Sequence, residues 1–129
     1  MKFSANLGFL WTELSLPDAI RAAKAAGFDA VECHWPYETS SADVLAALQE
    51  TRITMLGLNT RRGNVDAGEN GLAAVPDRVA DARAAIDEAI AYAYAIGCKA
   101  VHVMAGFSSG ADARDCFVAN LIYACTQAA

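Results

Sequence analysis

Hydrophobic and polar residues alternate along four short stretches of the chain, and each stretch is followed by a segment with helical periodicity. In residues 2–9, Phe3, Ala5 and Leu7 are separated by small or polar residues, which is the period of a β-strand. Between residues 77 and 96, the apolar positions 79, 82, 86, 89, 90 and 93 fall on one helical face. By the same criteria we expect strands at residues 2–9, 28–35, 53–60 and 99–104, and helices at residues 16–26, 42–50, 77–96 and 111–128.

Helix start and stop signals lie where the pattern changes. Pro17 stands in the first turn of the first predicted helix, and Gly27 follows its last turn. Residues 39–41 (TSS) are candidates to cap the second helix. The junction at Gly27 recurs at Gly97, because both lie in an Ala-x-Gly-x-x-Ala-Val segment. A repeated junction of helix, glycine and strand indicates a repeated βα unit.

Four βα units in 129 residues correspond to about 30 residues per unit, the usual size of a βα crossover. A closed (β/α)8 barrel has eight units in about 250 residues. Because the chain stops at the end of a helix, we predict an α/β fold that is a (βα)4 half of a TIM (β/α)8 barrel. We expect parallel strands in the order 1-2-3-4 and a single N-terminal half-barrel, residues 1–129, of a longer protein. The alternative is a flavodoxin-like open sheet, in which the first strand lies inside the sheet.

Composition and charge exclude some classes of binding partner. The chain is 55% hydrophobic and 19% charged, which is typical of a globular domain. Its net charge of −5 and its one adjacent basic pair, Arg61-Arg62, argue against nucleic acid as a partner. No apolar run reaches the roughly 18 residues of a membrane helix, and the N-terminal residues do not resemble a signal peptide. We therefore expect a cytoplasmic protein with no membrane partner, whose four cysteines are free thiols and not zinc ligands.

The phase of the predicted strands places polar residues on one face. If the apolar phase faces the helices, the opposite phase faces the barrel interior. The apolar, helix-facing set consists of Phe3, Ala5, Leu7, Val31, Cys33, Trp35, Leu56, Leu58, Val101 and Val103. That interior set consists of Ser4, Asn6, Gly8, Glu32, His34, Gly57, Asn59, His102 and Met104. A purely structural interior would use Val, Ile and Leu, and barrel active sites lie at the carboxyl ends of the strands. The pattern therefore predicts one polar pocket wall.

Each polar residue also has a structural interpretation. Glu32 could be a paired core carboxylate, and His34 and His102 could be hydrogen-bonded core residues, because neither has a metal-ligand spacing. Asn6 and Asn59 could bind a substrate hydroxyl or cap a loop. Arg61 and Arg62 follow the third strand and could clamp an anion or simply be solvated. No dinucleotide-binding, P-loop or G-x-S-x-G motif occurs, which excludes those nucleotide-binding and hydrolase classes.

Six segments resemble the hydroxypyruvate isomerase family, within the superfamily of xylose isomerase-like TIM barrels. They are residues 3–7 (FSANL), 26–32 (AGFDAVE), 35–37 (WPY), 58–60 (LNT), 66–73 (DAGENGLA) and 101–106 (VHVMAG). The resemblance implies metal-assisted conversion of hydroxypyruvate to tartronate semialdehyde through an enediolate. In that family two glutamates and the ligands of a divalent ion lie on the fifth to eighth strands. We therefore expect the catalytic and metal-binding groups beyond residue 129, and no metal ligand in this chain.

Within the chain we assign substrate binding to Asn6, Glu32, His34, Asn59, Arg61 and His102. A ketose 3-epimerase of the same superfamily is one alternative, and a catalytically silent assembly module is another. An open half-barrel exposes unpaired strand edges, which favour association with another chain. We therefore expect a homodimer or association with the missing C-terminal half, and little isomerase activity from the isolated chain.

Overall fold

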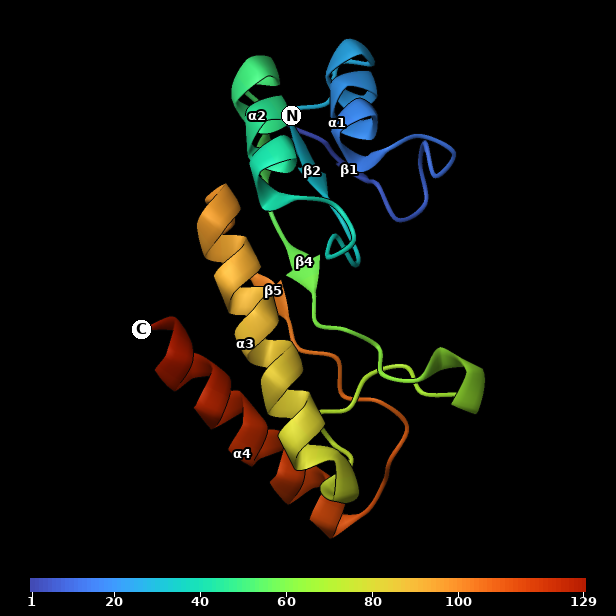
Figure 1. Cartoon of the computed structure of the whole chain (residues 1–129), viewed down its shortest axis with the longest axis vertical. Coiled ribbons are helices and arrows are strands. Elements are labelled where there is room, and N and C mark those ends of the chain that lie inside the picture. Colours follow the sequence, from blue (N-terminus) through green and yellow to red (C-terminus); the bar gives the residue numbers. More distant parts are fainter. The chain divides into compact units, whose positions relative to one another are not determined.

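Strands and helices alternate along the chain in the computed structural model, which describes all 129 residues (Figure 1). The helices begin and end close to the residues expected from periodicity, whereas the strands are shorter. The elements are β1 (Ser4–Asn6), α1 (Leu16–Ala25), β2 (Ala30–Glu32), α2 (Ser41–Thr51), β3 (Thr54–Met55), β4 (Leu58–Asn59), two short 3₁₀ turns η1 (Val65–Ala67) and η2 (Pro76–Arg78), α3 (Val79–Ile96), β5 (Val101–His102) and α4 (Ala111–Ala128).

The strand order agrees with the barrel prediction. β1, β2 and β3 form a parallel sheet in that order, with Asn6 opposite Glu32 and Val31 opposite Met55. A flavodoxin-like sheet would place the first strand between its neighbours, so that alternative is wrong. β4 pairs with β5, through bonds that include Leu58 N to Ala100 O at 3.3 Å. The predicted third strand thus pairs with the second through β3 and with the fourth through β4.

The third strand is interrupted, which the alternation of its residues did not reveal. Met55 and Leu58 are buried, whereas Leu56 is 44% exposed. The prediction that Leu56 and Leu58 share the helix-facing phase is therefore wrong for Leu56. The physical reason is that the predicted third strand pairs with β2 through residue 55 and with β5 through residue 58. The extra residue between these two pairings reverses which side chains face the helices, as a β-bulge does.

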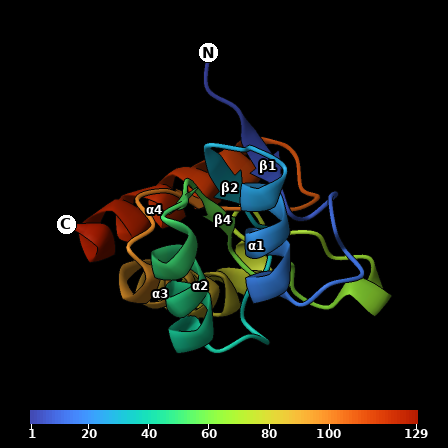
Figure 2. The same cartoon turned by 90° about the horizontal axis from the view of Figure 1, so that it is seen from above.

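Contacts divide the chain into two compact units, Met1–Leu58 with Tyr92–Val101 and Asn59–Ala91 with His102–Ala129. In the first unit, α1 and α2 pack together on one side of β1 and β2 (Figure 2). Ile20, Val31 and Val44 have no exposed surface there. Burial of such side chains contributes about 1.5–3 kcal/mol each, which is the main force that holds the helices to the strands.

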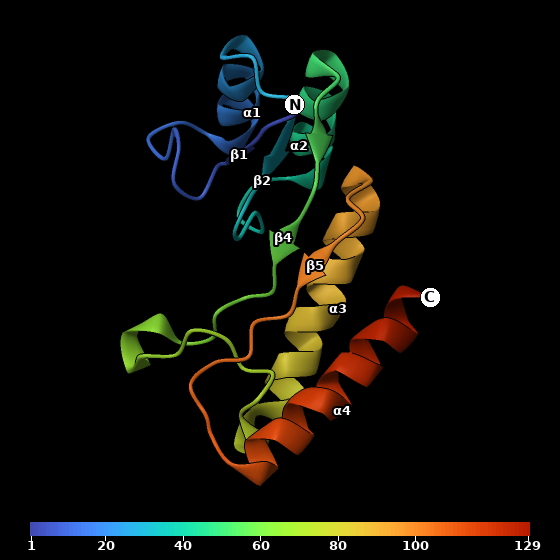
Figure 3. The ribbon, with the colours of Figure 1, turned by 180° about the vertical axis from the view of Figure 1, so that it is seen from behind.

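In the second unit, α4 runs beside α3 (Figure 3). Asn120 of α4 is fully buried, donates from Nδ2 to the Ala73 carbonyl at 2.9 Å, and accepts from Arg83 Nε at 3.3 Å. The Tyr123 hydroxyl lies 2.8 Å from a carboxylate oxygen of Asp87. The bonds of Asn120 satisfy a buried polar group, and those from Arg83 to Asn120 and from Tyr123 to Asp87 link the two helices.

Serine side chains cap the first two helices, and of these two caps only that of the second helix was predicted from the sequence. Ser15 accepts from Asp18 N at 3.3 Å, and Ser40, among the expected candidates, accepts from Ala42 N at 3.2 Å. No helix is long and apolar enough to cross a membrane.

Candidate active site

The register of β1 and β2 brings two predicted site residues together. Asn6 and Glu32 are Cα partners across the parallel pair, so their side chains share one face. The Ser4 hydroxyl donates to Glu32 Oε1 at 2.8 Å, and Asn6 Oδ1 accepts from Gly8 N at 2.9 Å. The Ser4 hydroxyl therefore orients the Glu32 carboxylate.

His34 is held by aromatic rings and by a glycine. Its ring packs edge-on against Phe9, with centroids 4.9 Å apart, and lies tilted against Trp35 at 5.0 Å. A Cβ at position 8 would collide with three atoms of the imidazole ring, so the ring rests on the backbone of Gly8. The sequence indicated His34 as a site residue but not these contacts, because only the fold places Gly8 and Phe9 against its ring.

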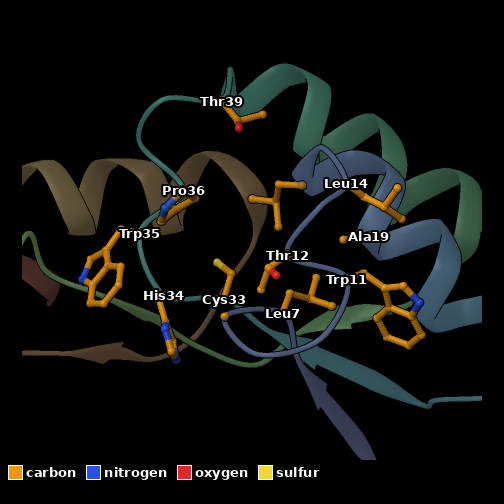
Figure 4. Close-up of a pocket in the computed structure, with 12 residues that line it drawn as sticks. Leu7, Trp11, Thr12, Leu14, Ala19, Cys33, His34, Trp35, Pro36 and Thr39 are labelled. Carbon is orange, nitrogen blue, oxygen red and sulfur yellow. The ribbon is translucent and has the colours of Figure 1, made fainter.

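A pocket of about 250 Å³ lies beside His34, between the loops that follow β1 and β2. Trp11 and Trp35 lie on opposite sides of it, and Thr12 and the Cys33 thiol lie near its centre (Figure 4). Burial raises the pKa of the Cys33 thiol to about 12, so this group stays neutral at physiological pH. The lining residues are Leu7, Gly8, Trp11, Thr12, Leu14, Leu16, Ala19, Cys33, His34, Trp35, Pro36 and Thr39.

Asn59 and His102 form a second pair of predicted site residues. His102 Nδ1 lies 3.3 Å from Asn59 Oδ1, within hydrogen-bonding distance. Thr60 Oγ1 accepts from Met104 N at 3.0 Å and ties the same two chain segments together.

The structure places Arg61 against a carboxylate of its own chain. Its guanidinium contacts Glu88 through Nε at 2.7 Å and Nη2 at 3.0 Å. Arg62 Nε donates to Asn70 Oδ1 at 2.8 Å. Glu88 lies 27 residues from Arg61 along the chain, and no sequence signal indicated that pairing. Arg61 and Glu88 both border a separate cavity of about 440 Å³.

Nowhere in the chain do three or more His, Cys, Asp or Glu side chains come together in an arrangement that could hold an ion. All four cysteines are free. The site residues described above carry carboxylate, imidazole, amide and guanidinium groups, which can form hydrogen bonds with a ligand.

Sequence comparisons connect the chain to isomerases. A model of the family described as xylose isomerase-like TIM barrel matches residues 20–129. A Xenopus laevis protein provisionally named hydroxypyruvate isomerase is 46% identical over 107 residues, which are 82% of this chain and 39% of that protein. A 2-oxo-tetronate isomerase of Pectobacterium atrosepticum is 42% identical over 127 residues, covering 95% of this chain and 48% of that protein. The chain thus spans less than half the length of these two relatives.

Superposition on solved structures supports the assignment of the chain to the TIM-barrel fold. The crystal structure of a Brucella melitensis protein named AP endonuclease, family 2, superposes with a TM-score of 0.90 at 31% identity, covering 98% of this chain and 50% of that one. A D-allulose 3-epimerase from Methylomonas sp. superposes with a TM-score of 0.72 at 19% identity, covering 100% and 48%. The second likeness concerns the fold alone. Together with the sequence matches, they confirm the predicted half of a TIM barrel and the predicted resemblance.

Proposed function

Since the chain belongs to the xylose isomerase-like TIM barrel family, we propose that the protein is an intramolecular isomerase of small hydroxy-oxo acids. The proposed reaction is the interconversion of hydroxypyruvate and tartronate semialdehyde. The observation that carries this proposal is the identity of 46% and 42% to relatives named for isomerisation of hydroxypyruvate and of 2-oxo-tetronate.

The reaction moves hydrogen between adjacent carbons. A base removes a proton from C3 of hydroxypyruvate, and the C2 carbonyl oxygen accepts a proton, which gives an enediol. A proton is then delivered to C2, and the C3 hydroxyl loses its proton to become the aldehyde. These steps require a base near carbon and hydrogen-bonding groups near both oxygens.

Residues of this chain suit the hydrogen-bonding part of this task, whereas the resemblance implies a base beyond residue 129. The Glu32 carboxylate is oriented by the Ser4 hydroxyl and accompanied by Asn6, which supports its assignment to substrate binding. In the other compact unit, His102 Nδ1 lies 3.3 Å from Asn59 Oδ1, which supports the same assignment for that pair.

Charge favours a small substrate over DNA, although the Brucella protein is named an endonuclease. The net charge is −5, and two exposed guanidiniums are compensated: Arg21 pairs with Asp18 and Glu50, and Arg61 with Glu88. Binding to a phosphate backbone requires clustered uncompensated positive charge. A small acid requires only one or two hydrogen-bonding groups.

A divalent ion, expected from the resemblance, is not assigned to any residue of this chain, and no step above depends on it. The test is the formation of tartronate semialdehyde from hydroxypyruvate by the full-length gene product, measured with and without a chelator. Aldehyde formation that a chelator abolishes would support a metal-assisted isomerase. No aldehyde from hydroxypyruvate under any condition would refute the proposed reaction.

A further inference from the structure

The last helix, α4, has apolar residues on two of its sides. On one side Ala113, Asn120 and Ala124 are buried within the second unit. On another side, apolar residues recur at positions 118, 121, 122, 125 and 129, which is the spacing of a second helical stripe. Together with Thr126 these residues line a groove along the helix; the members of this second stripe are Val118, Leu121, Ile122, Cys125 and Ala129.

The second stripe is open to solvent in this chain. Ile122 is 63% exposed and Val118 is 46% exposed, and Cys125 is exposed as well. Ile122 lies two positions after the fully buried Asn120, so the two side chains point to nearly opposite sides of the helix. The stripe is therefore separate from the face by which α4 packs on its own unit.

No charged side chain interrupts the stripe. Residues 116–129 contain no Asp, Glu, Lys or Arg, whereas α3 carries Asp81, Arg83, Asp87 and Glu88. A helix face that stays in water usually carries charged residues, and the centre of a contact between polypeptides is depleted of them. The composition of the stripe therefore indicates a surface that another polypeptide segment covers.

The family fold indicates which segment this is. In a TIM barrel the helices form a ring outside eight strands, so each helix has a neighbour on either side. α3 is one neighbour of α4, through the bonds of Arg83 with Asn120 and of Tyr123 with Asp87 (Figure 3). The chain superposes over 98% of its length on only 50% of the Brucella protein, with a TM-score of 0.90. The other half of such a barrel supplies the second neighbour.

We propose that the second stripe of α4 is the docking surface for the second half of a TIM barrel, and that this half can bind as a separate polypeptide. The partner is thus a set of βα units whose first helix presents an apolar face to Val118, Ile122 and Cys125. The proposal concerns assembly and does not depend on which reaction the assembled protein catalyses. A second copy of this chain is the competing occupant, and the experiment distinguishes the two.

The experiment co-expresses the full 129-residue chain with a tagged second half of the Pectobacterium isomerase, the part of that protein that this chain does not match. Co-purification reports binding. Brief thiol labelling with peptide mass mapping reports its location, because Cys125 belongs to the stripe. The test variant is Ile122→Glu, and the matched control is Gln127→Glu, which adds the same charge at an exposed position on another side of the helix. Since both positions are exposed, each variant alone should unfold at the wild-type temperature.

The second half should co-purify with the wild-type chain and with Gln127→Glu, and the labelling of Cys125 should fall at least about tenfold in the complex. Ile122→Glu should reduce the recovery of the second half at least about tenfold, because the contact loses a buried isoleucine and gains an unpaired charge. The absence of a complex would overturn the proposal, as would a complex in which Cys125 stays reactive or Ile122→Glu binds normally. A dimer of the isolated chain that protects Cys125 would also overturn it, because a second copy would then occupy the stripe.

Discussion

Gly71 and Gly106 meet backbone to backbone in the second unit. Gly71 forms an antiparallel bridge with Ala105, and a Cβ on Gly106 would collide with the carbonyl oxygen of Gly71. Both glycines have a φ in the left-handed region, +111° and +87°. The contact joins the end of the loop after β4 to the segment after β5, and no side chain fits at either position.

Substitution at this contact should destabilise the fold. Gly106→Ala adds a Cβ against backbone atoms that cannot rotate away, in a conformation that alanine disfavours. We expect the free energy of unfolding to fall by about 2–4 kcal/mol, measured by urea denaturation. Gly68→Ala is the control: its φ is +84° but nothing lies within 4 Å, so it should cost only about 1 kcal/mol. Equal losses would contradict the steric explanation.

Glu32→Gln should weaken the binding of hydroxypyruvate without unfolding the protein. The substitution preserves shape and can keep the bond from Ser4, but it removes the charged acceptor for a substrate hydroxyl. We expect Kd to rise by at least about tenfold, since a hydrogen bond to a charged group contributes about 1.5–3 kcal/mol. Glu50→Gln, in the exposed ion pair with Arg21, should leave Kd unchanged. If Glu32→Gln binds hydroxypyruvate as tightly as the wild type, Glu32 is not a substrate ligand.

Arg61 and Glu88 test the predicted anion clamp. Both side chains are more than a third exposed, so breaking the pair should change stability by less than about 1 kcal/mol. If Arg61 binds the substrate carboxylate, Glu88→Gln should tighten hydroxypyruvate binding about two- to fivefold by removing a competing charge. Arg61→Gln should weaken it. Calorimetric titration measures both, and an unchanged Kd in Arg61→Gln would remove Arg61 from the binding site.

Cys33 should make the protein less stable at high pH. Burial raises the pKa of its thiol from 9.0 to about 12, so between these values the unfolded chain loses a proton that the folded chain keeps. The free energy of unfolding should therefore fall with rising pH in this window, by up to about 1.4 kcal/mol per pH unit for one proton. Cys33→Ala should reduce the slope. Part of it should remain, because burial also raises the pKa of Tyr92 to about 12.

Thiol labelling provides an independent check of the same burial. Cys125 is exposed and should react with a thiol reagent in the folded protein, whereas Cys33 should react only after unfolding. Peptide mass mapping after brief labelling distinguishes the two cysteines. Early labelling of Cys33 would show that its pocket opens in solution.

Local patterns were sufficient to predict the elements and their order. Pro17 and Ser40 begin helices, Gly27 follows one, and the buried stripe of α3 includes Ala82, Ile86, Ala89 and Ala93, as its period indicated. These features depend on residues within a turn or two of one another, so the sequence contains the information directly. The same holds for the common face of Asn6 and Glu32, which strand phase indicates, whereas the register that places them opposite each other came from the structure.

Other features were decided only when distant segments met. The phase inversion at Leu56 arises because one strand serves two neighbours, and alternation alone cannot show a change of neighbour. Three further contacts join residues that lie 26 to 35 positions apart in the sequence. They are the ion pair of Arg61 with Glu88, the contact of the His34 ring with the backbone of Gly8, and the contact of Gly71 with Gly106. Periodicity reports which face a residue occupies, because that depends on its own backbone. Which side chain it meets on that face depends on packing, and packing exists only in the folded molecule.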